Sequence, residues 1–169
     1  VLVVTKDVRE AIGDAAGDNL TIIKVEDTRY AMAFISAAYF GHPAEKLKVI
    51  GITGTKGKST VTSLIYHILK ESGKKCIIAR NIGIPVFNIE EEMTDETIVV
   101  CELSCHQLEY MNVSPPAAVF LNLYEEHLDH YGTMERYYNA KKNIYLYQDE
   151  DDCLLINSDI APKDDDGLV

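Results

Sequence analysis

The residues with the clearest chemical potential form a glycine-rich loop between Gly51 and Thr60, with the sequence GITGTKGKST. An apolar stretch precedes the loop and a helical pattern follows it, which is the context of a phosphate-binding loop. Glycines let the backbone amides face phosphate oxygens, Lys58 can reach the terminal phosphates, and the Ser59 hydroxyl can ligate Mg²⁺. The general pattern has a glycine where this sequence has Ile52, so an ordinary strand-to-helix turn is the alternative. We predict that ATP or GTP binds here, at Thr53, Gly54, Thr55, Lys56, Gly57, Lys58, Ser59 and Thr60.

A phosphate-binding loop also needs a carboxylate that holds the metal at the end of a neighbouring strand. The apolar run 98–101 ends in Glu102. We therefore expect Glu102 to share a Mg²⁺ ion with Ser59, and a solvated glutamate at a strand end is the alternative.

The elements that must position these residues alternate along the chain. Apolar runs predict strands at 20–25, 48–52, 76–79, 97–101, 117–121 and 153–156. Helical spacing predicts helices over 29–40, 59–72 and 134–146, the last with Thr133 as its N-cap. Such alternation predicts an α/β fold, a mostly parallel sheet flanked by helices. We expect a boundary near residue 45, with residues 1–45 in one domain and residues 46–169 in another.

The composition of the chain argues against two classes of binding partner. The chain has 169 residues and a formal net charge of -11, which repels nucleic-acid backbones and anionic membrane surfaces. No apolar run approaches the roughly 20 residues of a membrane span. Four cysteines, Cys76, Cys101, Cys105 and Cys153, form no CxxC pair, so we expect buried free thiols and a cytoplasmic protein rather than a zinc site.

Three stretches together resemble the central domain of the Mur ligases. They are TGTKGKST at 53–60, ELSCHQLE at 102–109, and NLYEEHLDHYGTME at 122–135 with YNAK at 138–141. The resemblance covers roughly residues 45 to 160. It implies an ATP-dependent ligase of peptidoglycan biosynthesis, which joins an amino acid to a UDP-N-acetylmuramoyl precursor and works as a monomer. Residues 1–45 would then be the tail of the domain that binds the UDP-sugar, and a C-terminal domain would be missing, so we expect the chain alone to be inactive.

The resemblance also implies a mechanism. ATP would phosphorylate the carboxylate of the precursor, and an amine would displace phosphate from the acyl phosphate. Lys58, Glu102, His127 and Lys141 would be the catalytic residues. Ser59 and Glu102 would hold one Mg²⁺ ion, and His127 with Lys141 a second, Lys141 being carbamylated because an ammonium repels a cation.

The step within the family stays open. The segments VEDTR at 25–29 and YFGHP at 39–43 resemble the ligases that add lysine or diaminopimelate. By contrast, NIGIP at 81–85 and the residues around Glu102 resemble the enzyme that adds D-glutamate. Asn81 and Ser104 are candidate substrate contacts, while Gln107 could equally cap a helix. Lys56 replaces the usual asparagine, and Glu126 the usual aspartate.

Two other functions fit the same residues. A folylpolyglutamate synthetase uses similar chemistry on folate, although the Glu102 and His127 motifs match it less well. The second alternative is a phosphate-loop module that binds nucleotide without catalysis.

Overall fold

The computed structural model describes residues 1–8, 20–39, 47–80 and 93–162. The chain divides into two compact units, Val1–Glu45 and Lys46–Val169, at the boundary expected from the sequence. In the first unit, strands β1 (Leu2–Val4) and β2 (Ile22–Lys24) pair in parallel, and helix α2 (Thr28–Tyr39) follows them. The predicted strand at 20–25 and helix at 29–40 are both present.

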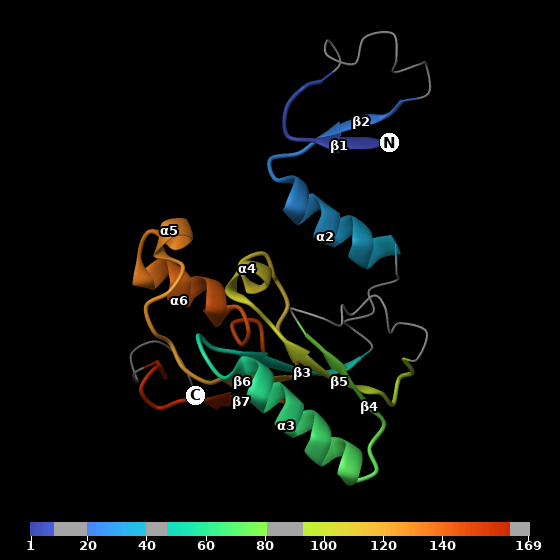
Figure 1. The fold of residues 1–169 in the computed structure, drawn as a ribbon. Coiled ribbons are helices and arrows are strands. Elements are labelled where there is room, and N and C mark those ends of the chain that lie inside the picture. The colour runs from blue at the N-terminus through green and yellow to red at the C-terminus, as the bar shows by residue number, and fades with distance from the viewer. Residues whose placement is uncertain (9–19, 40–46, 81–92, 163–169) are drawn as a thin grey trace. The chain divides into compact units, whose positions relative to one another are not determined.

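The second unit is built on a five-stranded parallel sheet (Figure 1). Its strands are β3 (Lys48–Thr53), β4 (Cys76–Ala79), β5 (Ile98–Glu102), β6 (Ala117–Phe120) and β7 (Cys153–Ile156). They lie in the order β4-β5-β3-β6-β7. The chain adds β4 and β5 on one side of β3 and then β6 and β7 on the other. The strand order therefore switches at β3, and ligands of such sheets bind at the carboxyl ends of the strands near this switch.

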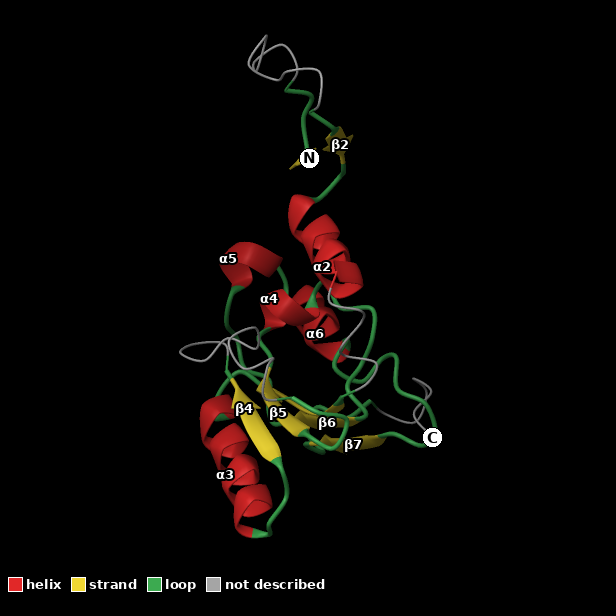
Figure 2. Cartoon of the chain, turned by 90° about the vertical axis from the view of Figure 1, so that its right-hand side faces the viewer, coloured by secondary structure: helices red, strands yellow, loops and turns green. Residues whose placement is uncertain are grey.

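Helices cover both faces of the sheet (Figure 2). Alternate strand residues, Ile52, Val100 and Val119, point to one face and pack against helix α3 (Lys58–Glu71). Residues between them, including Ala118 and Phe120, pack on the other face with Leu108 and Ile144. The helices of that side are α4 (Cys105–Leu108), α5 (Leu128–Tyr131) and α6 (Met134–Lys142). Burial on both faces explains why these strands are continuous apolar runs.

Several local predictions need correction. Helix α6 ends at Lys142 rather than at residue 146, because Asn143 is held by tertiary contacts: its Nδ2 donates to Leu108 O at 2.9 Å and its carbonyl accepts from Ser114 Oγ at 2.9 Å. The short helices α4 and α5 were not predicted. Of the four cysteines expected to be buried, Cys105 is buried, Cys76 and Cys101 are half-buried, and Cys153 is exposed. The N-cap prediction for α6 is confirmed, since the Thr133 side chain accepts from the amide of Arg136.

Within the described residues, no helix combines the length and the apolar character that crossing a membrane requires.

Candidate nucleotide site at the carboxyl edge of the sheet

The loop between β3 and α3 has the conformation that a phosphate-binding loop requires. Gly57 stands at the N-cap of α3 with φ of 83°, a left-handed conformation that glycine adopts without strain. The first amides of α3 have no acceptor within the helix, and the helix dipole places partial positive charge there. The loop therefore ends in an anion-binding helix N-terminus.

Lys58, the first residue of α3, folds back over this loop. Its Nζ donates to the carbonyl oxygens of Gly54 at 3.0 Å and Thr55 at 3.2 Å. These two bonds hold the ammonium group at the mouth of the loop, where it can meet a terminal phosphate.

Ser59 and Glu102 come together as predicted. The Ser59 hydroxyl donates to Glu102 Oε2 at 2.8 Å, and Glu102 is 8% exposed. The contact follows from the parallel register, which places Ile52 beside Glu102 and so brings the end of β5 next to the loop. A hydroxyl and a carboxylate oxygen are the donors that a hard cation such as Mg²⁺ prefers, so this pair fits the predicted metal.

Lys141 is sealed inside the protein beneath the loop. Its side chain is 1% exposed, and Nζ donates to Gly54 O at 2.9 Å and Thr53 Oγ1 at 3.4 Å. The ammonium also lies 5.0 Å from the centre of the Tyr137 ring. Burial lowers the pKa of Lys141 to about 8; the interaction with Cys105 opposes this shift, Lys58 adds to it, and Glu126 opposes it. The ammonium form still predominates at neutral pH, but the neutral, nucleophilic amine is far more populated than in an exposed lysine.

His127 occupies an unusual backbone position. With φ of 56° it is the one non-glycine residue of the described chain in the left-handed region. Its ring lies 6.0 Å from that of Tyr137, which also contacts Lys141, and 5.1 Å from that of His106. A non-glycine residue held in this region often marks a functional position. The structure thus groups His127 and Lys141 around Tyr137, a residue that the sequence analysis did not single out.

The two predicted substrate residues have different outcomes. Ser104 is the N-cap of α4: its hydroxyl accepts from the amide of Gln107, and its own amide donates to Gln107 Oε1 at 2.9 Å. This capping box confirms the capping role considered for Gln107, and a substrate contact of Ser104 stays a prediction. Asn81 lies outside the described residues.

Sequence reasoning missed the contacts that support the loop from below. The Thr55 hydroxyl interacts with Tyr137 Oη at 3.2 Å and accepts from the amide of Tyr124 at 2.9 Å, so this side chain points inward. The side chain of Asn122 binds the backbone of Thr55 and Lys56. A usable signal existed, since Asn122 is the first polar residue after the apolar strand β6, at the same edge of the sheet as the loop.

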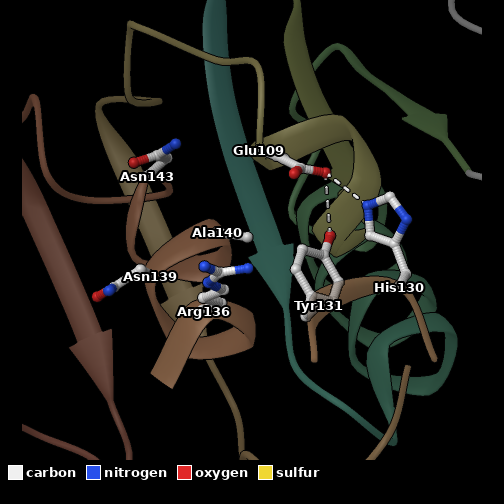
Figure 3. A pocket seen from close by; sticks show the side chains of 7 residues that line it. All are labelled: Glu109, His130, Tyr131, Arg136, Asn139, Ala140 and Asn143. Atoms are coloured by element: carbon white, nitrogen blue, oxygen red, sulfur yellow. Dashed lines mark hydrogen bonds and ion pairs between the residues drawn. The ribbon is translucent and has the colours of Figure 1, made fainter. Parts of the chain in front are cut away.

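A separate pocket of about 340 Å³ opens beside α5 and α6. Glu109 lies opposite α6 and accepts from His130 at 3.1 Å and from Tyr131 at 3.4 Å (Figure 3). Arg136, Asn139 and Asn143 complete the wall from the α6 side. None of the phosphate-loop residues lines this pocket, so it is distinct from the predicted nucleotide site.

The fold defines the class of the second unit: a parallel α/β domain with a glycine-rich loop, the predicted phosphate-binding loop, at its topological switch point. The family description "Mur ligase middle domain" matches residues 52–164. The chain belongs to the Mur ligase family.

Named relatives make the similarity more specific. The chain is 41% identical over 143 residues to the UDP-N-acetylmuramoylalanine--D-glutamate ligase of Clostridium kluyveri, covering 81% of this chain and 31% of that protein. It is 48% identical over 117 residues to the ligase of the same name from Acetivibrio thermocellus, covering 69% of this chain and 24% of that protein. The chain therefore spans about a third or less of these curated relatives.

Solved structures share the fold at lower sequence identity. One is MurF ligase from Thermotoga maritima in complex with ADP, with a TM-score of 0.56, 22% identity, and coverage of 91% of this chain and 42% of that one. Another is a UDP-N-acetylmuramoyl-L-alanyl-D-glutamate--2,6-diaminopimelate ligase, with a TM-score of 0.61, 17% identity, and coverage of 91% of this chain and 39% of that one. The predicted α/β fold is thus confirmed.

Proposed function

We propose that this chain is the ATP-handling core of a ligase that adds D-glutamate to a UDP-N-acetylmuramoyl-alanine precursor in the cytoplasm. The observation that supports it most strongly is the contact between Ser59 and Glu102 at the mouth of the loop, beside the Lys58 ammonium. The names of the curated relatives favour the D-glutamate step over the lysine or diaminopimelate step. The solved structures carry the names of other Mur ligases. Their sequence identity to this chain is low, so they support the fold and not the step.

The residues of the site would all serve one chemical requirement, which is to bring two anions together. The loop amides from Gly57 onward and Lys58 would neutralise the phosphates of ATP, so that its terminal phosphoryl group can pass to the precursor carboxylate. This transfer yields an acyl phosphate and ADP. The amine of D-glutamate would then attack the acyl carbon, an amide bond would form, and inorganic phosphate would leave. Thr53, Gly54, Thr55, Lys56 and Thr60 complete the proposed nucleotide site.

Mg²⁺ fits this site and would supply charge neutralisation when bound. Ser59 and Glu102 would hold one ion, and their oxygen atoms already lie 2.8 Å apart. His127 and a carbamylated Lys141 would hold the second. The described residues contain no cluster of three or more histidine, cysteine or acidic side chains placed to hold a metal, so this second position depends on the modified lysine.

The burial of Lys141 supports its modification. A neutral amine attacks CO₂ at carbon, the amine loses a proton, and a carbamate forms. Burial favours the neutral amine by lowering the pKa of Lys141 to about 8. The carbamate would carry a negative charge into the same buried position, which a metal ion beside the loop would compensate.

Residues outside the loop would serve the precursor. Asn81 and Ser104 are proposed contacts to its sugar or carboxylate, and residues 1–45 are proposed as part of the unit that binds the UDP group. The relatives are much longer than this chain, so ligation is proposed for the full-length protein, acting as a monomer.

The test is a ligation assay on the full-length protein. ATP and Mg²⁺ are supplied either with UDP-N-acetylmuramoyl-L-alanine and D-glutamate, or with UDP-N-acetylmuramoyl-L-alanyl-D-glutamate and L-lysine or diaminopimelate. The nucleotide peptide product and ADP are measured in each case. We expect equal amounts of product and ADP with D-glutamate only. Product with another amino acid would move the enzyme to another step, and ADP formation without any product would favour a nucleotide-hydrolysing module.

A further inference from the structure

We propose that Asn122 is a positioning residue that determines which backbone amides of the phosphate loop are available to the nucleotide. This inference rests on the proposed function, because it assumes that the loop binds ATP.

The ladder between β3 and β6 continues past the ends of both strands. The amide of Leu121 donates to Thr53 O at 3.0 Å, and the amide of Thr55 donates to Asn122 O at 3.1 Å. These bonds continue the parallel register that pairs Thr53 with Phe120. Asn122 therefore stands where strand pairing ends and the loop begins to curl.

From this position the side chain of Asn122 continues the hydrogen bonding to the backbone of the loop. Its Oδ1 accepts from the amides of Thr55 at 3.1 Å and Lys56 at 2.9 Å, and its Nδ2 donates to the carbonyl of Lys56 at 3.0 Å. The amide group thus acts as acceptor and donor at once. An asparagine meets both requirements, whereas an aspartate would place an oxygen against the Lys56 carbonyl.

The backbone amides of the loop therefore fall into two groups, those bound to Asn122 and those available to a ligand. Thr55 and Lys56 direct their amides to Asn122 and away from a ligand. The amides at Gly57 and in the first turn of α3 remain for phosphate oxygens, where the helix N-terminus favours an anion. Because the loop is held in this shape in advance, the nucleotide does not have to order it on binding.

The opposite side of the loop depends on the same geometry. The carbonyls of Gly54 and Thr55 hold the Lys58 ammonium, and the Gly54 carbonyl also accepts from Lys141. Loss of the Asn122 contacts would therefore loosen the lysine that faces the terminal phosphate. The expected defect is in nucleotide binding, with no direct effect on the precursor.

The experiment compares Asn122→Ala and Asn122→Asp with Asn157→Ala in the full-length protein. Asn157 is the matched control, because it follows β7 and its Nδ2 donates to Leu121 O at 3.1 Å without touching the loop. The dissociation constant for Mg-ATP is measured by titration calorimetry, the KM for the precursor by steady-state kinetics, and folding by urea denaturation.

For both Asn122 variants we expect Mg-ATP to bind about 10-fold more weakly or worse, because the loop is no longer held in the shape that presents the amides from Gly57 onward to the phosphates. The KM for the precursor should stay within about twofold of the wild-type value, and Asn157→Ala should bind Mg-ATP like the wild type. If Asn122→Ala does not fold, the isosteric Asn122→Asp decides.

Mg-ATP affinity within about twofold of wild type in a folded Asn122 variant, or an equal loss in Asn157→Ala, would overturn the inference. Failure of the wild-type protein to bind Mg-ATP would instead overturn the proposed function together with it.

Discussion

At the phosphate loop, the charged and polar groups of the site lie in short hydrogen bonds near the surface, whereas beneath it a lysine is sealed in the interior. Lys58 stays partly exposed and is held by two carbonyls, and Ser59 meets Glu102. Lys141 is 1% exposed, and among the described residues it forms no ion pair with a carboxylate. The loop therefore holds its polar groups in hydrogen bonds near the surface, whereas the buried part of the proposed site holds a positive charge in the interior.

This difference indicates that the buried part of the site, around Lys141, needs a further group that balances its charge. A buried ammonium without a carboxylate partner is destabilising unless it is neutralised or modified. His127, on the same side, also holds a strained backbone conformation. The two features together point to a region arranged for a metal ion or substrate rather than for stability.

The largest expected effect concerns the exposed end. Lys58→Ala removes the ammonium that faces the terminal phosphate, and we expect the ligation rate of the full-length protein to fall by about 10²–10³-fold. The control is Lys70→Ala, on the last turn of the same helix and away from the loop, which should leave the rate unchanged. Nearly wild-type ligation by Lys58→Ala would show that the loop does not bind phosphate as proposed.

A comparable loss of ligation is expected when the buried lysine is removed, but this loss should be partly reversible. Lys141→Ala should abolish most ligation, and small carboxylates added to the buffer should restore part of it by taking the place of the carbamate. Lys142→Ala, the next residue on the helix, is the control and should remain active. Intact-protein mass spectrometry in bicarbonate should show a gain of about 44 Da that Lys141→Ala lacks. An active Lys141→Ala variant would remove this lysine from the site.

Much of this arrangement could be predicted from the sequence. The strand and helix pattern is clear because buried parallel strands are continuous apolar runs and α3 is a long amphipathic helix. The contact between Ser59 and Glu102 follows from the rule that carboxyl ends of parallel strands meet at one edge. For these features the local sequence pattern is enough to predict the tertiary contact.

Other features could not be found in this way. Helices α4 and α5 are four residues long, too short for a helical period to show. The sequence marks Asn122 as a polar residue after a strand, but its contacts with the loop depend on the register between β3 and β6. The burial of Lys141 depends on how α6 packs beneath the loop. Only the family resemblance singled out Lys141, because a lysine on a helix is usually exposed.

The third expected effect is a pH dependence of stability caused by the buried lysine. The folded-state pKa of Lys141 is about 8, below the value of roughly 10.4 for a lysine in an unfolded chain. Between these values the unfolded chain binds more protons, so this group makes the protein more stable as the pH rises from about 8 to 10. Below pH 8 its unfavourable contribution is fully present.

Urea denaturation of wild type and Lys141→Met in bicarbonate-free buffer measures this contribution. The free energy of unfolding of the wild type should rise relative to that of the variant by on the order of 3 kcal/mol across the interval. Parallel pH profiles of the two proteins would show that the ammonium is not buried in solution.

The smallest expected effect tests the strain at His127. Its φ of 56° disfavours a side chain by about 1 kcal/mol, and glycine escapes this penalty. We therefore expect His127→Gly to be more stable than His127→Ala by about 1 kcal/mol in urea denaturation. The same pair of substitutions at His130, inside α5, should give the opposite order, since glycine is less favourable than alanine in a helix. Both variants at position 127 should lose ligation equally, because both lack the imidazole. A more stable His127→Ala would mean that the backbone there relaxes to an ordinary conformation, and strain would no longer distinguish this end of the site from the loop.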